Sequence, residues 1–299
     1  MRSTVYVRNF ESTLRMLADR GHDVVVVADP HRTHLIDRIR RESRRLRYVP
    51  GLRVPFNRWS FLGAEIRRAL DYLRYLEPEY AGATKLRQRA QRKAPKLLTA
   101  LLQSPLARSP IGRPLLRRVL RQCDRAIPRD PAVDAFIRPH DPDLVLVTPL
   151  VEPGSPQSDI VRSARALKVP AGLCAYSWDN LTNKGLIHDT LGLITVWVRA
   201  MADEATTLHD VQRTAVRITG TAAYDHWFSW RPRDSRDSFC ARVGLAIHAP
   251  YLLYLCSSKF ISHDELPFIR RWVTGIRDAS RALRDVSVLV QPTKAMHRS

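Results

Sequence analysis

The sequence predicts a mixed α/β protein built on a parallel sheet. Short, continuous apolar runs alternate with longer amphipathic segments along most of the chain. Such runs are typical of strands that are buried on both faces, as in parallel sheets covered by helices. The strand–helix–strand spacing recurs, which favours βαβ units. At 299 residues, 44% of them hydrophobic, the chain has room for two domains of ordinary size.

The N-terminal region is predicted to fold as a strand–helix–strand unit. Residues 5–7 are a very short strand candidate, and the apolar residues at 10, 14, 17 and 18 have the spacing of one helix face. Asn9 and Gly21 stand where an N-cap and a C′ residue are expected. A valine run at residues 23–28 supplies the next strand. The opening strand is short, since strands usually have about five or six residues.

Residues 50–140 are predicted to form a helical, basic insert. A basic helix at about residues 32–47 precedes it, and an irregular stretch at 50–59 opens it. Residues 61–125 have the pattern of several helices with leucine-rich faces, which Pro105, Pro110 and Pro114 break into pieces. Helices of this kind either rest on a membrane surface or cover a sheet, and the sequence leaves both interpretations open.

Regular α/β alternation resumes after the insert. The expected strands are 144–147, 171–176, 192–197 and 215–219, with helices at 155–168 and 200–208. An aromatic stretch at 224–230 and a charged, proline-containing linker at 231–238 follow. A strand at 251–256, a helix at 264–283 and a strand at 286–290 have the pattern of a second α/β domain that is incomplete. We therefore expect two domains, residues 1–230 and 231–299.

The charge distribution is strongly one-sided. The formal net charge is +20, and residues 1–140 hold 30 Lys and Arg against 13 Asp and Glu. A basic field attracts phosphate-rich partners such as anionic lipids, nucleic acids or nucleotide-linked substrates. However, 42 of the 49 basic residues are Arg, which codon bias alone could produce. The four cysteines have no C-x-x-C spacing, and no apolar run approaches the length of a membrane helix, which favours a cytoplasmic, reduced protein.

A polar loop at residues 177–185 is the strongest candidate for a site. It follows a buried strand, and the carboxyl ends of parallel strands meet at the edge of the sheet where ligands bind. Other polar or glycine-containing turns are expected at the same edge, together with basic side chains suited to a phosphate-bearing molecule. The candidate ligand-binding residues are Arg8, Asn9, Ser177, Trp178, Asn180, Lys184, Gly185, Gly220, Ser257, Ser258 and Lys259. No Walker, dinucleotide-binding or zinc-protease motif occurs, and we expect no metal site.

Several of these segments resemble a bacterial family of glycosyltransferases with the GT-B architecture, in which two Rossmann-like domains face each other across a cleft. The resemblance rests on residues 7–11 with 14, 17 and 20–22, on 177–185, on 216–220 with 224–228, and on 251–258. It covers most of the chain and is weakest over 50–140. Within it, the first domain is a Rossmann-like acceptor-side domain with a parallel sheet, and the second begins a nucleotide-sugar-binding domain.

The resemblance implies transfer of a sugar from a nucleotide sugar to an acceptor hydroxyl of a glycan or lipid, in the synthesis of cell-surface polysaccharide or glycolipid. It implies no bound cofactor, with the nucleotide sugar as co-substrate. We expect no specific nucleic-acid partner. Asp179 is the candidate general base, or else a residue that orients Lys184 or holds the loop. Trp178 either stacks on a sugar or plugs the loop into the core.

The chain departs from the family pattern in three places. The opening strand is nearly missing, and Val198 and Arg199 follow Trp197 where the family has Asn and Glu. The chain also ends early in the second domain, so we expect a C-terminally truncated donor site, and activity of this fragment stays open. The alternatives are a nucleotide-sugar epimerase of the same architecture, and a non-catalytic basic module that binds an anionic membrane surface or nucleic acid through residues 32–125. The expected location is the cytoplasm, including the inner face of the plasma membrane.

Overall fold

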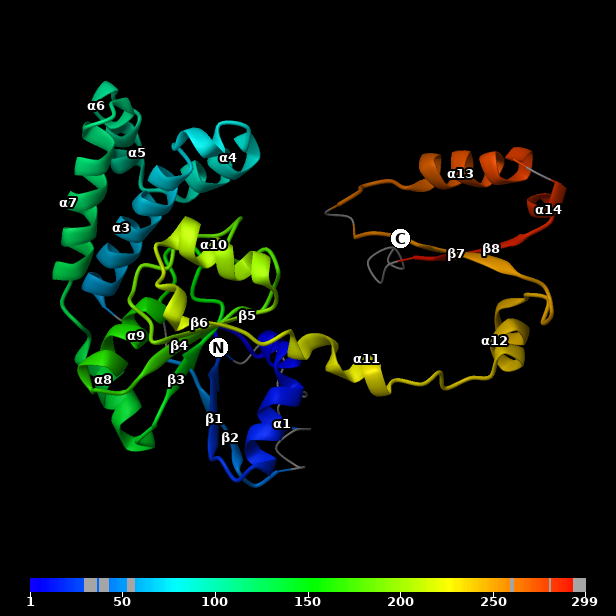
Figure 1. The fold of residues 1–299 in the computed structure, drawn as a ribbon, viewed down its shortest axis with the longest axis horizontal. Helices are drawn as coiled ribbons and strands as arrows, with labels where there is room; N and C mark the ends of the chain where they lie inside the picture. Colours follow the sequence, from blue (N-terminus) through cyan, green and yellow to red (C-terminus); the bar gives the residue numbers. More distant parts are fainter. Residues whose placement is uncertain (30–36, 38–42, 53–56, 259–260, 280, 293–299) are drawn as a thin grey trace. The chain divides into compact units, whose positions relative to one another are not determined.

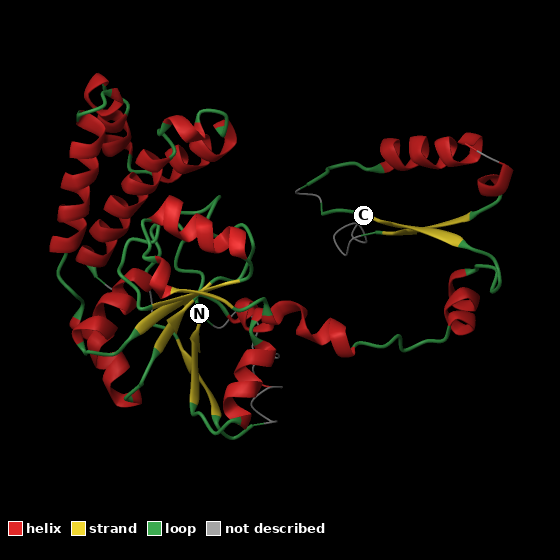
Figure 2. Cartoon of the chain, in the orientation of Figure 1, coloured by secondary structure: helices red, strands yellow, loops and turns green. Residues whose placement is uncertain are grey.

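The computed structural model describes residues 1–29, 37, 43–52, 57–258, 261–279 and 281–292. It is a mixed α/β structure, 51% helical, in which all pairs of strands in these ranges are parallel (Figure 1, Figure 2). The predicted α/β class with parallel sheets is therefore confirmed. The chain divides into two units, Met1–Ser229 and Trp230–Ser299, here called unit 1 and unit 2.

Unit 1 contains a two-stranded and a four-stranded parallel sheet. The first pairs β1 (Val24–Ala28) with β2 (Leu46–Pro50), and the second has the order β3 (Val145–Val147), β4 (Ala171–Cys174), β5 (Leu193–Val196), β6 (Val216–Ile218). Helix α9 (Gln157–Ala166) connects β3 to β4, and α10 (Arg199–His209) connects β5 to β6. A core that includes Leu173, Ile194 and Val161 lies between this sheet and its helices. The strands predicted in these places are confirmed within two residues.

The first four residues connect the two sheets. The ammonium group of Met1 donates to the carbonyl of Val27 at 2.6 Å, and Ser3 forms a parallel bridge with Asp29. On the other side, the N–H of Arg2 donates to the carbonyl of Thr148 at 3.2 Å, just beyond β3. These residues thus occupy a strand position between β1 and β3. The spatial order is then β2, β1, residues 1–3, β3, β4, β5, β6. If residues 1–3 are counted as the first strand and the others are renumbered along the chain, this is the order 3-2-1-4-5-6 with β6 as one added strand at the end. Such an order is compatible with a Rossmann-like fold.

The strand predicted at residues 5–7 is wrong. These residues lie in a 3-10 helix, η1 (Thr4–Asn9), because the strand position is already taken by residues 1–3 and the Ser3 hydroxyl accepts from the N–H of Val5. Val7 is buried under β1 and β2. Helix α1 (Glu11–Asp19) follows, and its N-cap is Phe10, not Asn9. Gly21 has φ +91°, the left-handed conformation expected of a C′ glycine.

A group of broken helices confirms the helical character predicted for residues 61–125. The helices are α3 (Arg58–Arg74), α4 (Thr84–Lys93), α5 (Lys96–Leu102), α6 (Pro105–Arg108) and α7 (Gly112–Ala126), followed by α8 (Pro131–Ile137). Leu70, Leu73, Leu102 and Leu120 share their core. Most of the basic helix expected at 32–47 lies outside the described residues, but its predicted end is wrong, because residues 46 and 47 belong to β2. Strand β2 was missed because its sequence, Leu-Arg-Tyr-Val-Pro, is not an apolar run.

Buried ion pairs join these helices to the sheet layer. The guanidinium of Arg67 in α3 is 1% exposed and lies 3.2 Å from Asp124 in α7 and 3.7 Å from Asp159 in α9. Arg162 of α9 contacts the same Asp124 at 2.5 Å and Asp189 at 2.9 Å. Burial alone would lower the pKa of Arg162, but the two carboxylates raise it above its ordinary value. The helical insert is therefore fixed to the α/β part through largely buried charges.

Unit 2 has the strand–helix–strand order predicted for residues 251–290. Its elements are α12 (Arg236–Val243), β7 (Tyr251–Leu255), α13 (Leu266–Ala279), α14 (Arg281–Arg284) and β8 (Ser287–Gln291). The two strands pair in parallel from Tyr251 with Ser287 to Leu255 with Gln291.

Unit 1 also contains short helical segments between its longer elements. They are η2 (Pro78–Tyr80), η3 (Arg138–His140), η4 (Arg213–Ala215), η5 (Ala222–Tyr224) and α11 (Asp225–Ser229).

Candidate functional site

A hollow of about 480 Å³ lies in unit 1 at the carboxyl edge of the sheets. Its lining comes from four segments, each of which follows a strand position: η1, the loop after β4, the residue after β5, and the η5–α11 turn after β6. The lining residues are Arg8, Asn9, Tyr176, Ser177, Trp178, Trp197, Ala223, Tyr224, His226 and Trp227. Open parallel sheets bind ligands at this edge because successive loops converge there. We call this hollow the aromatic pocket.

Four of the candidate residues meet in the aromatic pocket. Arg8 and Asn9 approach it from η1, and Ser177 and Trp178 approach it from the loop after β4. The amide of Asn9 lies 3.5 Å from the carbonyl oxygen of Tyr176, which joins the two segments. Residues more than 160 positions apart in the sequence are thus placed side by side by the parallel topology.

Aromatic side chains form most of the pocket wall. Trp178 is 69% exposed and Trp227 is 57% exposed, so neither plugs the loops into the core. Trp197 is held more firmly, because its indole N–H donates to the carbonyl of Ala175 at 3.0 Å and its ring meets Tyr224 edge-on at 5.9 Å. His226 lies 4.8 Å from the ring of Trp227. The pocket therefore offers both firmly held and solvent-exposed ring faces.

Asn180 is a buried residue that fixes the shape of the loop beside the pocket. Its side chain is 1% exposed, and its Oδ1 accepts from the backbone N–H groups of Tyr176 and Ser177 at 2.9 and 3.0 Å. These two bonds turn the chain sharply at the end of β4, which directs Ser177 and Trp178 outward. Asn180 is a structural residue of the pocket and is not part of its lining.

Asp179 holds the loop through both carboxylate oxygens. One accepts from the Ser177 hydroxyl, and the other accepts from the Asn183 amide at 2.5 Å. Partial burial raises the pKa of Asp179, but these hydrogen bonds and the charge of Lys184 outweigh it and leave the pKa below its ordinary value. A carboxylate in this state is a weak proton acceptor, and it lies outside the pocket lining. This arrangement favours the loop-holding role of Asp179 over the role of a base.

The remainder of the loop docks on the end of α3. The Asp71 carboxylate is 2% exposed and accepts from the N–H of Leu186 at 2.7 Å and from His188 at 2.9 Å. Arg74 donates to the carbonyl of Leu181 at 3.0 Å, and the Tyr75 hydroxyl donates to the carbonyl of Lys184 at 2.6 Å. Several polar groups of residues 181–188 thus contact the helical insert.

Lys184, Gly185 and Gly220 have structural surroundings. The ammonium of Lys184 lies 3.5 Å from Glu152, away from the pocket lining. A Cβ on Gly185 would lie 2.6 Å from the Asp71 carboxylate, so glycine is required there by close packing. Gly220 has φ +73° and turns the chain after β6 toward the pocket residues Ala223 and Tyr224.

A buried histidine also holds the same loop. His209, at the end of α10, is 5% exposed. Its Nδ1 accepts from the N–H of Ile187 at 3.0 Å, and its Nε2 lies 2.7 Å from the carbonyl of Leu181. Burial, reinforced by the nearby Arg74 charge, lowers the pKa of His209 to about 3, so the ring is neutral at physiological pH.

The candidates in unit 2 surround a buried carboxylate. Ser257 donates to Glu265 with its N–H at 2.8 Å and with its hydroxyl at 3.0 Å, and Tyr254 donates to the same group at 3.1 Å. The Ser258 carbonyl accepts from the N–H groups of Ile261 and Ser262. Lys259 lies outside the described residues. Ser257 and Ser258 thus shape the turn at the carboxyl end of β7.

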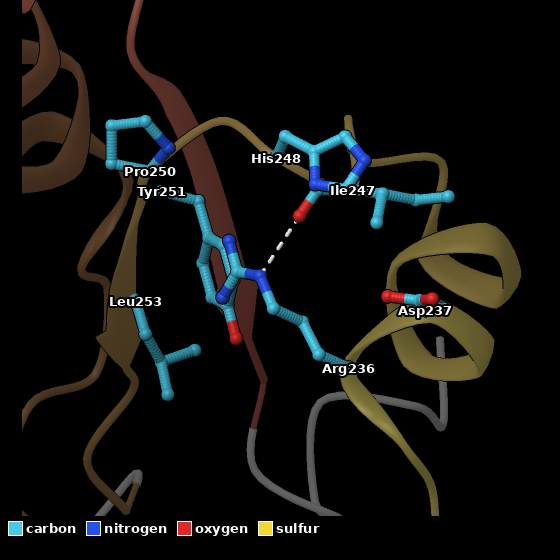
Figure 3. Close-up of a pocket in the computed structure, with 7 residues that line it drawn as sticks. All are labelled: Arg236, Asp237, Ile247, His248, Pro250, Tyr251 and Leu253. Atoms are coloured by element: carbon cyan, nitrogen blue, oxygen red, sulfur yellow. Dashed lines mark hydrogen bonds between the residues drawn. The ribbon is translucent and has the colours of Figure 1, made fainter.

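Unit 2 has a hollow of its own, at the amino end of β7 (Figure 3). Its lining is Arg236, Asp237, Ile247, His248, Pro250, Tyr251 and Leu253. The guanidinium of Arg236 stacks on Tyr251 and donates to the carbonyls of Ile247 and Ala249 at 2.9 and 2.7 Å. Because this is the edge of the strand away from the ligand side of a parallel sheet, and because Arg236 is engaged by the chain itself, we do not regard this hollow as the site.

Several lining residues were missed by the sequence analysis. Tyr176 and Trp197 stand at strand ends, and Tyr224, His226 and Trp227 lie in the aromatic stretch noted at 224–230. The sequence did contain a signal for these three, since the aromatic stretch follows β6 after a short turn. Within the described ranges, no group of His, Cys, Asp or Glu side chains has the arrangement of a metal site. No described helix has the length and apolar character to cross a membrane.

Comparison of the chain with protein-family models and with curated proteins identifies no matching family and no similar protein.

Proposed function

We propose that the chain is a glycosyltransferase-like protein whose unit 1 binds a sugar-bearing acceptor in the aromatic pocket. The observation that carries this proposal is the composition of the pocket: exposed tryptophans beside an amide, a hydroxyl, a guanidinium and an imidazole, at the carboxyl edge of a parallel sheet. The C–H faces of sugar rings pack on electron-rich aromatic faces. Sugar hydroxyls take hydrogen bonds from side chains of the other four kinds.

The charge of the pocket supports an acceptor in preference to a nucleotide diphosphate. Arg8 is the single charged group among its lining residues, apart from the ionisable His226. A diphosphate is usually held by several cationic or N–H donors, often at a helix N-terminus. Under this proposal unit 2 belongs to the nucleotide-sugar side of a GT-B-type architecture, with β7 as its opening strand.

Within this proposal His226 is better suited than Asp179 to activate the acceptor. It lines the pocket, and imidazole is the side chain most often used for proton transfer near neutral pH. The acceptor oxygen would form a bond to the anomeric carbon as the bond to the nucleoside diphosphate breaks, and the hydroxyl proton would pass to the imidazole. Asp179 would keep Ser177 in place.

Binding is tested first, with alkyl glycosides as probes and tryptophan fluorescence of the full chain as the readout. We expect a saturable change, and Trp178→Ala should weaken the affinity about tenfold because one ring face is lost. Trp59→Ala is the matched control, since Trp59 is also partly exposed but lies on α3, outside the pocket lining. Saturation by nucleoside diphosphates with no glycoside binding would overturn the acceptor assignment.

Turnover is tested separately, by release of nucleoside diphosphate from nucleotide sugars in the presence of an alkyl glycoside. His226→Asn should lower kcat about a hundredfold, the usual contribution of a general base, with little change in glycoside affinity. Asp179→Asn should keep most of the turnover. The reverse pattern would assign the base to Asp179.

A further inference from the structure

The helical insert carries an unusual charge pattern on its outer helices. Residues 81–123 contain eleven Lys and Arg and no Asp or Glu. Some of these cations are used internally: Arg113 and Arg117 pair with Glu77. Others are exposed to solvent, namely Lys85, Arg92, Lys93, Lys96 and Arg118.

The same helices expose large aliphatic side chains. In α5, Leu97 is 89% and Leu101 is 42% exposed; ahead of and along α7, Ile111 is 82%, Leu115 is 54% and Val119 is 49% exposed. We call these five residues the apolar stripe. Single exposed leucines are common on soluble proteins, whereas five on two helices that both contact α3 and α6 indicate an interaction surface.

The position of the stripe follows from helix geometry. Leu98 and Leu102 of α5 and Leu116 and Leu120 of α7 pack in the core of the insert. Each residue of the stripe within these helices directly precedes one of them, and a step of one residue turns the side chain about 100° away from the core. Helix α6 contacts both α5 and α7, and Figure 1 shows the three helices next to one another.

We propose that α5 and α7 form a membrane-surface anchor that binds a bilayer rich in anionic lipid. The aliphatic side chains would enter the boundary between headgroups and acyl chains, while the exposed Lys96 and Arg118 on the same helices would contact lipid phosphates. Apolar insertion next to cationic residues is the usual pattern of interfacial helices. The absence of any acidic residue over 81–123 removes repulsion from an anionic surface.

Two features disfavour nucleic acid as the occupant of this surface. Residues 81–123 contain no Phe, Tyr or Trp, whereas proteins that bind single strands usually stack the bases on aromatic rings. Exposed leucine and isoleucine make no favourable contact with a charged phosphate backbone, whereas they do insert into the surface of a bilayer. The inference does not rest on the proposed glycosyl transfer.

The test is co-sedimentation of the full chain with vesicles of phosphatidylcholine alone or mixed with phosphatidylglycerol. We expect binding to the mixed vesicles and little to phosphatidylcholine. Leu97→Ser with Ile111→Ser should weaken this binding at least about tenfold, since two large side chains no longer enter the bilayer. Lys96→Gln and Arg118→Gln should each weaken it about fivefold.

The matched control is Ile261→Ser with Leu266→Ser, which removes two exposed aliphatic residues from unit 2. Its binding should stay within about twofold of the parent chain. The anchor is overturned if mixed vesicles do not bind, if the Leu97 and Ile111 variant binds as well as the parent, or if an RNA probe binds more tightly than vesicles and independently of these two residues. The anchor is also overturned if the chain self-associates through the apolar stripe and does not bind vesicles. Alkyl glycoside binding should be unchanged in every variant, which separates this test from that of the aromatic pocket.

Discussion

The loop between β4 and β5 has two halves that are held in different ways. Ser177 and Trp178 face the aromatic pocket, where Trp178 is 69% exposed. Residues 181–188 face α3 and His209, where Asp71 is 2% and His209 is 5% exposed. In the sequence both halves carry polar side chains. The comparison teaches that a polar loop at a strand end can owe much of its composition to docking against another part of the same chain.

The difference should be largest in the effect of Asp71→Ala on stability. Removing this buried carboxylate leaves the N–H of Leu186 and the ring of His188 without their acceptor. We expect the free energy of unfolding to fall by about 3 kcal/mol, measured by urea denaturation. Asp143→Ala, at an exposed site before β3, should change it by less than about 0.5 kcal/mol. Equal effects of the two substitutions would mean that α3 does not hold the loop.

The next effect is a pH dependence that arises from His209. In the native state its pKa is lowered from 6.5 to about 3, so between these values the unfolded chain binds a proton that the native chain does not. Stability should therefore fall as the pH drops below 6.5, by up to about 1.4 kcal/mol per pH unit from this one group, with no further loss below about pH 3. His209→Gln should remove this part of the slope, and His22→Gln, at an exposed site, should retain it. The measurement is urea denaturation at a series of pH values.

A smaller effect is expected at the junction of the two halves. Asp179→Asn loses the charge that strengthens the hydrogen bonds from Ser177 and Asn183. We expect a loss of about 1 kcal/mol in the free energy of unfolding and a modest loss of glycoside affinity, because Ser177 is less well placed. A stability loss as large as that of Asp71→Ala would place Asp179 in the docked half of the loop.

The smallest effect on stability belongs to Trp178→Ala. Since this side chain is largely exposed, the free energy of unfolding should change by less than about 0.5 kcal/mol. Trp197→Ala is the informative partner, because Trp197 lines the same pocket but packs against the core of the sheet. It should cost about 2 kcal/mol. If the Trp178 variant were equally destabilised, the exposed half of the loop would be structural too.

The sequence was sufficient for most of the regular structure and for part of the site. The apolar run at residues 171–176 identified β4, because burial on both faces leaves a direct trace in composition. The run at 251–256 also identified a parallel strand, β7, although its residues are half-buried or exposed. Strand β2 was missed because Arg47 interrupts its apolar pattern. Residues 5–7 are helical because residues 1–3 already fill the strand position that was predicted for them. The partners of the loop could not be predicted, since Asp71, Arg74 and Tyr75 lie about a hundred residues away and give no local sign of where they dock.

Arg67 has a consequence for the cooperativity of unit 1. Its partners Asp124 and Asp159 sit on the insert and on the sheet layer respectively. If either region opened alone, a bare guanidinium or carboxylate would remain in an apolar interior, and that penalty suppresses partial unfolding. Amide hydrogens in α3 and in β4 should consequently exchange through the same global event. Excision of the insert would therefore not yield a smaller stable domain, because Asp159 would stay buried in the sheet layer without its partner Arg67.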